Sequence, residues 1–374
     1  MFSAAESDAL HARVRAFITA SLSPRGEPAE PFDALALDLA RAQAAHIPEM
    51  ARLARARGVD LSLAHEASAI PAVPCDVFRL ARLAVHPPAC DVALFRTSGT
   101  SQGVRGEHAL RTVETYELAA LTWGARHLWP DGAALRALVL TPSIAQVPDS
   151  SLGFMLDRFA RALERPPAFL MPLDARGEAA IDLDGLAAAA AEARAAGAPV
   201  IVLATSFALV HLLDGPGGLD LRLPAGSRVM QTGGFKGRSR EIAPDALRAL
   251  VARAFAVPET HVVSEYGMTE LSSQLYEGTL AAALGHGPAL PHGVYLPPPW
   301  VRVTAVDPGS LLPVPRGEIG LARVVDLANV DSAVAIQTAD CVRVVAGGIE
   351  LLGRQPGATP RGCSIAADEM LGRA

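Results

Sequence analysis

The chain has 374 residues and a formal net charge of −6 at pH 7. Half of its residues are hydrophobic and 19% are charged, which is typical of a globular protein with one large domain or two medium ones and excludes a disordered chain. The acidic balance argues against a nucleic-acid-binding surface.

No targeting or membrane-spanning segment is expected. Residues 1–17 lack a basic stretch followed by an apolar core, as a secretion signal would have. The most apolar run, residues 200–213, is too short and too polar to cross a bilayer. The cysteines lie far apart without a CxxC pair, which argues against a zinc site or a disulfide scaffold; they are Cys75, Cys90, Cys341 and Cys363. These features predict a cytoplasmic protein with no nucleic-acid partner.

The first two thirds of the chain alternate between strand and helix patterns. Apolar periodicity predicts one or two amphipathic helices over 32–57, and a short buried strand at 93–95 enters a glycine-rich loop that is followed by a helix to about residue 128. Further strands are expected at 135–141, 199–205, 228–232 and 261–264, and helices at 151–164, 182–196, 207–213 and from Pro244. Strands alternating with helices of this length predict an α/β fold with mainly parallel sheets flanked by helices.

From Trp300 onward the pattern changes to short strands without helices, at 301–306, 317–327 and 342–345. A proline- and glycine-rich span at 285–299 precedes them. We therefore expect a smaller β-rich subdomain towards the C-terminus.

The loop that follows the strand at 93–95 reads FRTSGTSQGVRGEH over residues 95–108. Its glycines permit positive φ and close approach, and its short hydroxyl side chains donate hydrogen bonds, so the loop could wrap a phosphate. It is not the common P-loop, because Val104 and Arg105 follow Gly103 where a Lys and a Ser or Thr would stand. An ordinary polar turn is the alternative.

Three other polar segments are expected at the carboxyl ends of strands, at 141–151, 232–240 and 264–273. Ligands of parallel α/β sheets bind at that edge, which favours one nucleotide-sized site. The segment TGGFKGRSRE at 232–241 surrounds Lys236, the only lysine of the chain, with glycines and arginines; it is either a phosphate or purine contact or a solvated turn. In SEYGMTELSSQ at 264–274, Glu270 is a hard oxygen ligand of the kind Mg²⁺ accepts, or a structural residue at a strand end.

Together these motifs resemble a known superfamily. FRTSGTSQG, SEYGMTE and the later TAD at 338–340 are similar in order and spacing to the phosphate loop, the YGxTE segment and the TGD segment of the adenylate-forming enzymes. These are the acyl-CoA synthetases, peptide-synthetase adenylation domains and luciferases. IPAVPCDVF at 70–78, the lysine-containing loop and the GCS near the C-terminus are most similar to the LuxE-like acyl-protein synthetases. The resemblance covers residues 32–369.

The resemblance implies roles for individual residues. Residues that would hold the ATP phosphates are Thr97, Ser98, Gly99, Thr100 and Gly103. The nucleotide site would be completed by Gly233, Gly234, Tyr266, Gly267 and Met268 beside the adenine and the acyl group, Thr269 at the α-phosphate, Glu270 on Mg²⁺ and Asp340 on the ribose, with Arg354 in the segment that matches the hinge. ATP and Mg²⁺ are thus the expected cofactors.

Two departures from the superfamily pattern concern cationic groups. The phosphate loop lacks the lysine that usually follows its last glycine, and Ala374 comes shortly after the hinge segment, so the small C-terminal domain with its catalytic lysine is expected to be absent. Adenylation needs a cation near the α-phosphate, where negative charge builds in the transition state. Lys236 is the candidate. Alternatives are Arg105, Arg238 and Arg240, or a Lys236 that only lies on the surface.

Cys363, in PRGCSIAADEM, is the candidate acyl acceptor. Thiolates attack acyl-adenylates, and the neighbouring glycine and arginines favour an exposed, ionisable thiol. In the LuxE-like family a cysteine near the C-terminus receives the acyl group and passes it to a partner reductase. The alternative is an inert core cysteine.

These observations predict an adenylate-forming ligase. It would activate a carboxylic acid, by resemblance a fatty acid, as acyl-AMP and transfer the acyl group to Cys363 as a thioester. Alternatives are delivery to coenzyme A or a carrier-protein thiol, and a non-catalytic nucleotide-binding protein. The expected domains are an N-terminal helical part at 1–92, a nucleotide-binding α/β core at 93–299, the β-rich subdomain at 300–352 and a hinge remnant at 353–374.

Overall fold

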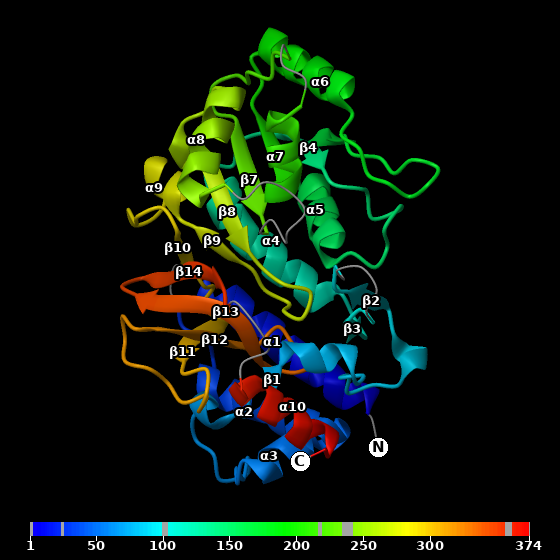
Figure 1. Ribbon diagram of the computed structural model, residues 1–374, viewed down its shortest axis with the longest axis vertical. Coiled ribbons are helices and arrows are strands. Elements are labelled where there is room, and N and C mark those ends of the chain that lie inside the picture. The colour runs from blue at the N-terminus through cyan, green and yellow to red at the C-terminus, as the bar shows by residue number, and fades with distance from the viewer. Residues whose placement is uncertain are drawn as a thin grey trace. The chain divides into compact units, whose positions relative to one another are not determined.

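The structure is a computed structural model that describes residues 3–23, 26–98, 104–215, 219–233, 242–355 and 361–373. The chain divides into two compact units. Figure 1 shows the chain coloured by residue number. The first unit comprises Met1–Ala120, Met268–Ser273 and Pro297–Ala374, and the second comprises Leu121–Gly267 and Gln274–Leu296.

The second unit is a mixed, mainly parallel sheet covered by helices. Its strands follow the order β10-β9-β8-β7-β6-β4-β5, in which the pairs from β8 to β5 are parallel. The strands are β4 (Arg136–Leu140), β5 (Arg165–Phe169), β6 (Val200–Thr205), β7 (Arg228–Thr232), β8 (Val262–Tyr266), β9 (Leu275–Glu277) and β10 (Val294–Leu296). The helices are α5 (Ser151–Ala162), α6 (Leu183–Ala196), α7 (Ser206–Leu213), α8 (Pro244–Phe255) and α9 (Thr279–Ala283).

The core of this unit follows from the alternation of side chains along its strands. Leu138, Val202 and Val229 are paired in register, so they point to one face, and they form a buried cluster with apolar residues of α6, α7 and α8. Proline at the first position of α8 and glycine after the end of α6 mark helix boundaries that sequence already favours. The predicted α/β class with a mainly parallel sheet is confirmed.

The first unit contains an antiparallel sheet and a hairpin. The sheet has the order β11-β12-β13-β14, with β1 (Val73–Pro74) parallel to β13. Its main strands are β11 (Val301–Val306), β12 (Ile319–Asp326), β13 (Ala335–Val345) and β14 (Gly348–Arg354), and the hairpin pairs β2 (Ala93–Arg96) with β3 (Glu107–Leu110). The helices are α1 (Ala4–Ser21), α2 (Phe32–His46), α3 (Pro48–Ala56) and α10 (Arg361–Leu371), while α4 (Glu114–Leu128) begins in this unit.

Three sequence expectations need correction here. The loop after β2 leads into β3 and not directly into a helix, and β2 and β3 form a separate antiparallel pair, so this loop does not follow a strand of the parallel sheet. The region after Trp300 is not free of helices, because α10 ends it. The four expected domains remain a prediction.

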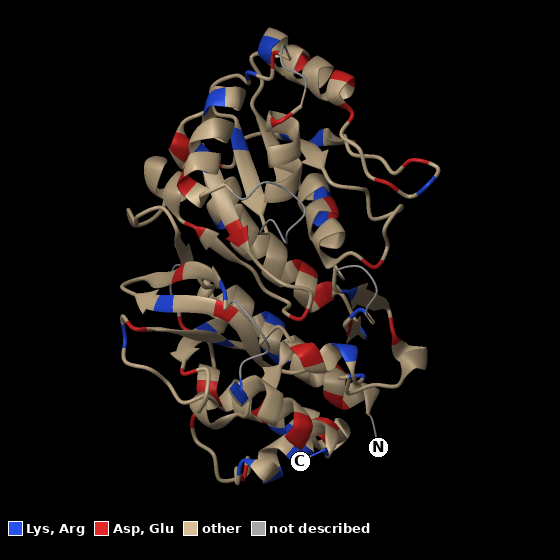
Figure 2. Cartoon of the chain, viewed as in Figure 1, with Lys and Arg blue, Asp and Glu red and all other residues tan. Residues whose placement is uncertain are grey.

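The distribution of charge agrees with the acidic composition. Lys and Arg are interspersed with Asp and Glu along the elements of each unit (Figure 2). Within the described part of the chain, no helix combines the length and apolar character that a membrane span requires.

Candidate functional site

The base of the candidate phosphate loop is closed by hydrogen bonds within the first unit. Thr97 N donates to Gly106 O, and Gly106 N donates to the Thr97 hydroxyl, both at 2.9 Å. A Cβ at Gly106 would lie only 3.2 Å from the Thr97 methyl group, so glycine permits this close approach. Ser98 is exposed beside it. The remaining loop residues, Gly99, Thr100 and Gly103, lie outside the described residues.

Arg105 binds the backbone at this base. Its guanidinium donates to the carbonyl oxygens of Thr97 at 2.6 Å and Arg96 at 3.0 Å. These contacts give Arg105 a structural task in closing the loop, which weakens the case for it as the cation at the α-phosphate.

Thr269 and Glu270 lie on a segment of the first unit, residues 268–273, that is bound by side chains from elsewhere in the same unit. His108 Nδ1, on β3, lies 2.7 Å from the Thr269 carbonyl oxygen. Asn329 Nδ2 donates to the Glu270 carbonyl oxygen at 2.9 Å. Glu270 itself is 8% exposed.

Asp340, Arg354 and Glu270 form an electrostatic group in the first unit. Arg354 Nε donates to Asp340 Oδ1 at 3.1 Å across the β13–β14 pair, and the guanidinium also interacts with the Glu270 carboxylate. The unit thus brings together the residues to which the sequence assigned the metal, the ribose and the hinge. Their roles remain predictions.

Cys75 belongs to the same group, although no sequence pattern placed it there. The preceding residue, Pro74, pairs with Gln337 in register, which sets Cys75 beside the start of the TAD segment. Burial raises the pKa of the Cys75 thiol to about 12, and the charges of Glu270 and Asp340 add to the rise. The thiol is therefore protonated at neutral pH.

Met268 lies in the first unit, at the start of residues 268–273, whereas further candidate residues belong to the second unit, at the carboxyl ends of β7 and β8. Gly233 has a φ of 75°, which favours glycine, and Tyr266 is buried with its ring 6.4 Å from that of Tyr295. A Cβ at Gly267 would lie 2.5 Å from Glu265 Oε1, so a larger residue there would displace the Glu265 carboxyl group. Gly234, Lys236, Arg238 and Arg240 lie outside the described residues.

Glu265 is a buried acid at this sheet edge. It faces Thr232 across the β7–β8 pair and accepts a hydrogen bond from the Thr232 hydroxyl. Burial raises its pKa from 4.5 to about 7.

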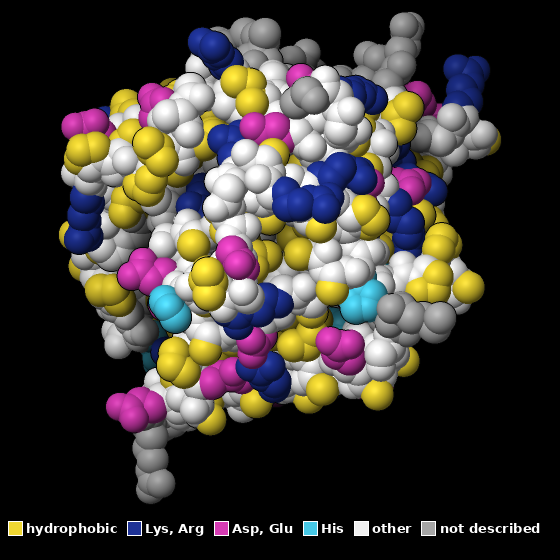
Figure 3. All heavy atoms as spheres, turned by 90° about the horizontal axis from the view of Figure 1, so that it is seen from below, with side chains coloured by type: hydrophobic (Ala, Val, Ile, Leu, Met, Phe, Trp, Pro, Cys, Tyr) yellow, Lys and Arg dark blue, Asp and Glu magenta, His cyan; other side chains and the backbone are white. Residues whose placement is uncertain are grey.

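Cys363 is not exposed, contrary to expectation. It is 4% exposed and packs with Val306 and Leu321, and burial raises the pKa of its thiol to about 11. The reason is that α10 docks tightly: a Cβ at Gly362 would lie 2.8 Å from Pro308 O, and Arg52 and Arg57 of the α3 region bind Met370 O and Glu369. The end of the unit that carries α3 and α10 is seen from below in Figure 3, where hydrophobic, basic and acidic side chains are interspersed.

The donor set near Glu270 suits a magnesium ion that arrives with a nucleotide. No group of three or more His, Cys, Asp or Glu side chains arranged to hold a metal occurs among the described residues. Mg²⁺ commonly uses one or two carboxylates together with substrate phosphates and water. Glu270 supplies one such carboxylate, and nucleotide phosphates and water would complete the coordination.

Comparison with known proteins gives the fold. No family model and no curated protein matches the sequence. Among solved structures, 2-hydroxyisobutyryl-CoA ligase in the postadenylation state, in complex with R3-HIB-AMP, matches with a TM-score of 0.61 and 13% identity over 95% of this chain and 69% of that one. The chain has the adenylate-forming fold.

Two further structures share this adenylate-forming fold. An open conformation of the same ligase with 2-HIB-AMP and CoA gives a TM-score of 0.62 at 14% identity, over 86% of this chain and 69% of that one. ATP-bound MatB from Rhodopseudomonas palustris gives 0.50 at 18% identity over 71% of this chain and 48% of that one. The chain thus spans about half the length of MatB.

Sequence reasoning missed His108, Asp326 and Asn329, all of which bond residues 268–273. A signal for the last two was present, since DLANVDS at 326–332 places polar residues between two apolar strands, where a buried polar group must find partners. His108 carried no such signal.

The raised pKa of Glu265 predicts how the free energy of unfolding depends on pH. Its carboxyl is protonated in the folded protein up to about pH 7 but ionises near pH 4.5 when unfolded, so its contribution is fully present below pH 4.5 and is lost as the pH rises through 7. Between pH 4.5 and 8, the free energy of unfolding of wild type should fall by about 3 kcal/mol relative to Glu265→Gln. Urea denaturation across this range measures the difference, and parallel profiles of the two proteins would contradict the shift.

Proposed function

We propose that the chain activates a carboxylic acid with ATP. The carboxylate oxygen attacks the α-phosphorus, the bond to the bridging oxygen of the β-phosphate breaks, and acyl-AMP and pyrophosphate form. The observation that carries the proposal is the group of Glu270, Asp340 and Arg354 in the first unit. Thr269, next to Glu270 in the chain, is held by His108 through its carbonyl oxygen. The adenylate-forming fold supports the same reaction.

Each residue has a task in this proposal. The Glu270 carboxylate would hold Mg²⁺, which supplies charge neutralisation on the phosphates. Asp340 would accept hydrogen bonds from the ribose hydroxyls, and the Thr269 hydroxyl would bond the α-phosphate. Thr97 and Ser98 lie at the hydrogen-bonded base of the loop. The hydroxyl and N–H groups of the loop would donate to the β- and γ-phosphates of ATP.

Pyrophosphate exchange tests the proposal. Wild type should incorporate labelled pyrophosphate into ATP only when an acceptable acid is added, so a panel of short, aromatic and long-chain acids also identifies the substrate class. Glu270→Gln should lower the exchange rate about 100-fold, because it removes the proposed metal ligand. Glu318→Gln, an exposed residue of the same unit, is the matched control. Binding of nucleotide without exchange by wild type for any acid would leave a non-catalytic nucleotide-binding protein.

Lys236 is proposed as the cation at the α-phosphate. Lys236→Ala should lower exchange about 100-fold, while Lys236→Arg should retain part of the rate because the charge remains. Exchange by Lys236→Ala equal to that of wild type would remove Lys236 from the mechanism and favour Arg238 or Arg240.

Two thiols compete as the acyl acceptor. The LuxE-like resemblance supports Cys363 as acceptor, a fatty acid as substrate and a partner reductase as the next recipient. The burial of Cys363 and its raised pKa favour an external thiol, on coenzyme A or a carrier protein, because the thiolate is the nucleophile. In either case the thiolate attacks the acyl carbonyl carbon and AMP leaves.

Labelling separates the two acceptors. With ATP, Mg²⁺ and labelled acid but no added thiol, an acceptor role for Cys363 predicts a hydroxylamine-sensitive label on wild type that is absent from Cys363→Ser. An external acceptor predicts no such label and equal thioester formation by both proteins when coenzyme A is added. Label that persists on Cys363→Ser would exclude Cys363.

A further inference from the structure

Three buried side chains of the first unit hold residues 268–273. His108 lies at hydrogen-bond distance from the Thr269 carbonyl oxygen. Asn329 donates through Nδ2 to Glu270 O and accepts from the Ser272 hydroxyl through Oδ1 at 2.5 Å. Asp326 accepts from Ser272 N at 3.0 Å and from the Ser273 hydroxyl at 2.7 Å. The backbone on both sides of Glu270 is therefore fixed by side chains far away in sequence.

The geometry of these bonds leaves little freedom at Thr269 and Glu270. His108 is 1% exposed, and Asn329 and Asp326 are fully buried, so water cannot replace their bonds without rearrangement of the unit. Asn329 uses its remaining Nδ2 proton on Ala333 O at 3.0 Å, which fixes the orientation of its amide. Because successive carbonyl groups are held, the side chains of Thr269 and Glu270 leave the backbone in defined directions.

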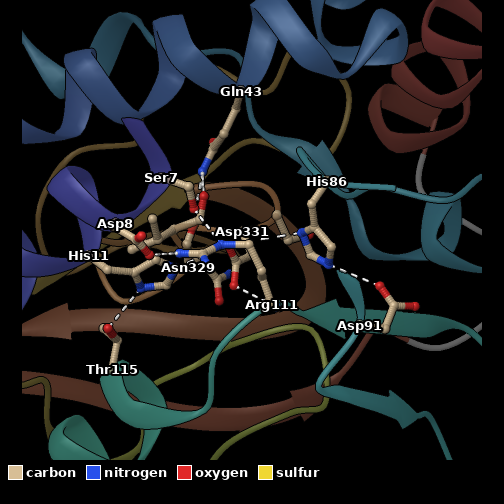
Figure 4. A network of polar contacts seen from close by, with 12 residues as sticks. Ser7, Asp8, His11, Gln43, His86, Asp91, Arg111, Thr115, Asn329 and Asp331 are labelled. Carbon is tan, nitrogen blue, oxygen red and sulfur yellow. Dashed lines mark hydrogen bonds and ion pairs between the residues drawn. The ribbon is translucent and has the colours of Figure 1, made fainter. Parts of the chain in front are cut away.

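The support continues into the N-terminal helices, as Figure 4 shows. Gln43 of α2 donates to Asn329 O at 2.7 Å and accepts from Val334 N at 2.9 Å. Asp331, next but one to Asn329, bonds His11 of α1 at 3.0 Å and accepts from Arg111 N at 2.8 Å. The connection from β12 to β13 is thus also held by side chains of α1 and α2 and by the backbone of Arg111.

We propose that His108 and Asn329 are positioning residues for adenylation, which hold Thr269 and Glu270 in the geometry that the nucleotide and its metal ion require. This inference rests on the proposed function. Neither residue contacts the reacting atoms; each acts through the backbone of residues 268–273. A displacement of about 1 Å at such a site lowers the rate about 100-fold.

Conservative and disruptive variants test the role. His108→Asn can place an amide N–H near the Nδ1 position, whereas His108→Leu cannot donate. Asn329→Asp keeps the shape of the side chain but sets a carboxylate against two carbonyl oxygens.

His108→Leu and Asn329→Asp should each lower kcat of pyrophosphate exchange about 100-fold with little change in KM for the acid, and His108→Asn should recover most of the rate. Ser332→Ala, which removes a buried bond to Leu83 O from the same connection, is the control and should keep the wild-type rate.

A second readout does not depend on turnover. Amide hydrogen exchange over residues 268–273 should be faster in His108→Leu and Asn329→Asp than in wild type and Ser332→Ala, and thermal stabilisation by ATP with Mg²⁺ should be smaller. If wild type shows no pyrophosphate exchange with any acid, the proposed function is wrong, while amide exchange still decides whether the segment is held. Unchanged amide exchange, or unchanged kcat in both disruptive variants of an active enzyme, would overturn the inference.

Discussion

The first unit depends on a buried polar connection, residues 326–334, between its two central strands. Asp326, Asn329 and Asp331 are at most 1% exposed, and a buried polar group without partners costs more free energy than a typical hydrogen bond contributes. Each therefore has several partners, drawn from α1, the β3–α4 connection and residues 268–273. Burial raises the pKa of Asp326 to about 6, although its hydrogen bonds oppose the rise. A connection that is satisfied only when all these segments are in place gives the unit one arrangement.

The sequence predicted the second unit better than the first. Its strands and helices alternate with clear periods, and the proline of α8 marks a boundary, so local patterns determine the elements. In the first unit, β3 has four residues, too few to show a period. The 11 residues of α10 do show one, since the buried Cys363, Ala366 and Met370 follow helical spacing, and this signal was missed. The motifs predicted Thr269, Glu270 and Asp340 as site residues, because their residue types and spacing carry chemistry, and their roles remain predictions. The sequence did not predict the contacts of His108 and Asn329, because their partners are backbone carbonyl groups that no local pattern reveals.

The cysteines show that neighbouring residue types in the sequence do not determine the exposure and surroundings of a side chain. Glycine and arginine around Cys363 suggested exposure, yet Gly362 permits close docking of α10 and the arginines Arg52 and Arg57 bind its far end. Small residues serve both flexible segments and tight contacts. Cys75, in contrast, lies among the charges of Glu270, Asp340 and Arg354 through the pairing of a two-residue strand, which sequence periodicity cannot detect.

The first unit also joins chain segments that are synthesised at very different times. His11 and its partner Asp331 are separated by 320 residues, and β1 pairs with β13, close to the end of the chain. Contacts of such long range slow folding, because loop closure precedes the stabilisation that it allows. During translation, α1 and α2 emerge before the strands that complete their unit, and the whole second unit is made in between. Their apolar faces therefore remain partly uncovered on the ribosome until β11–β14 have been made.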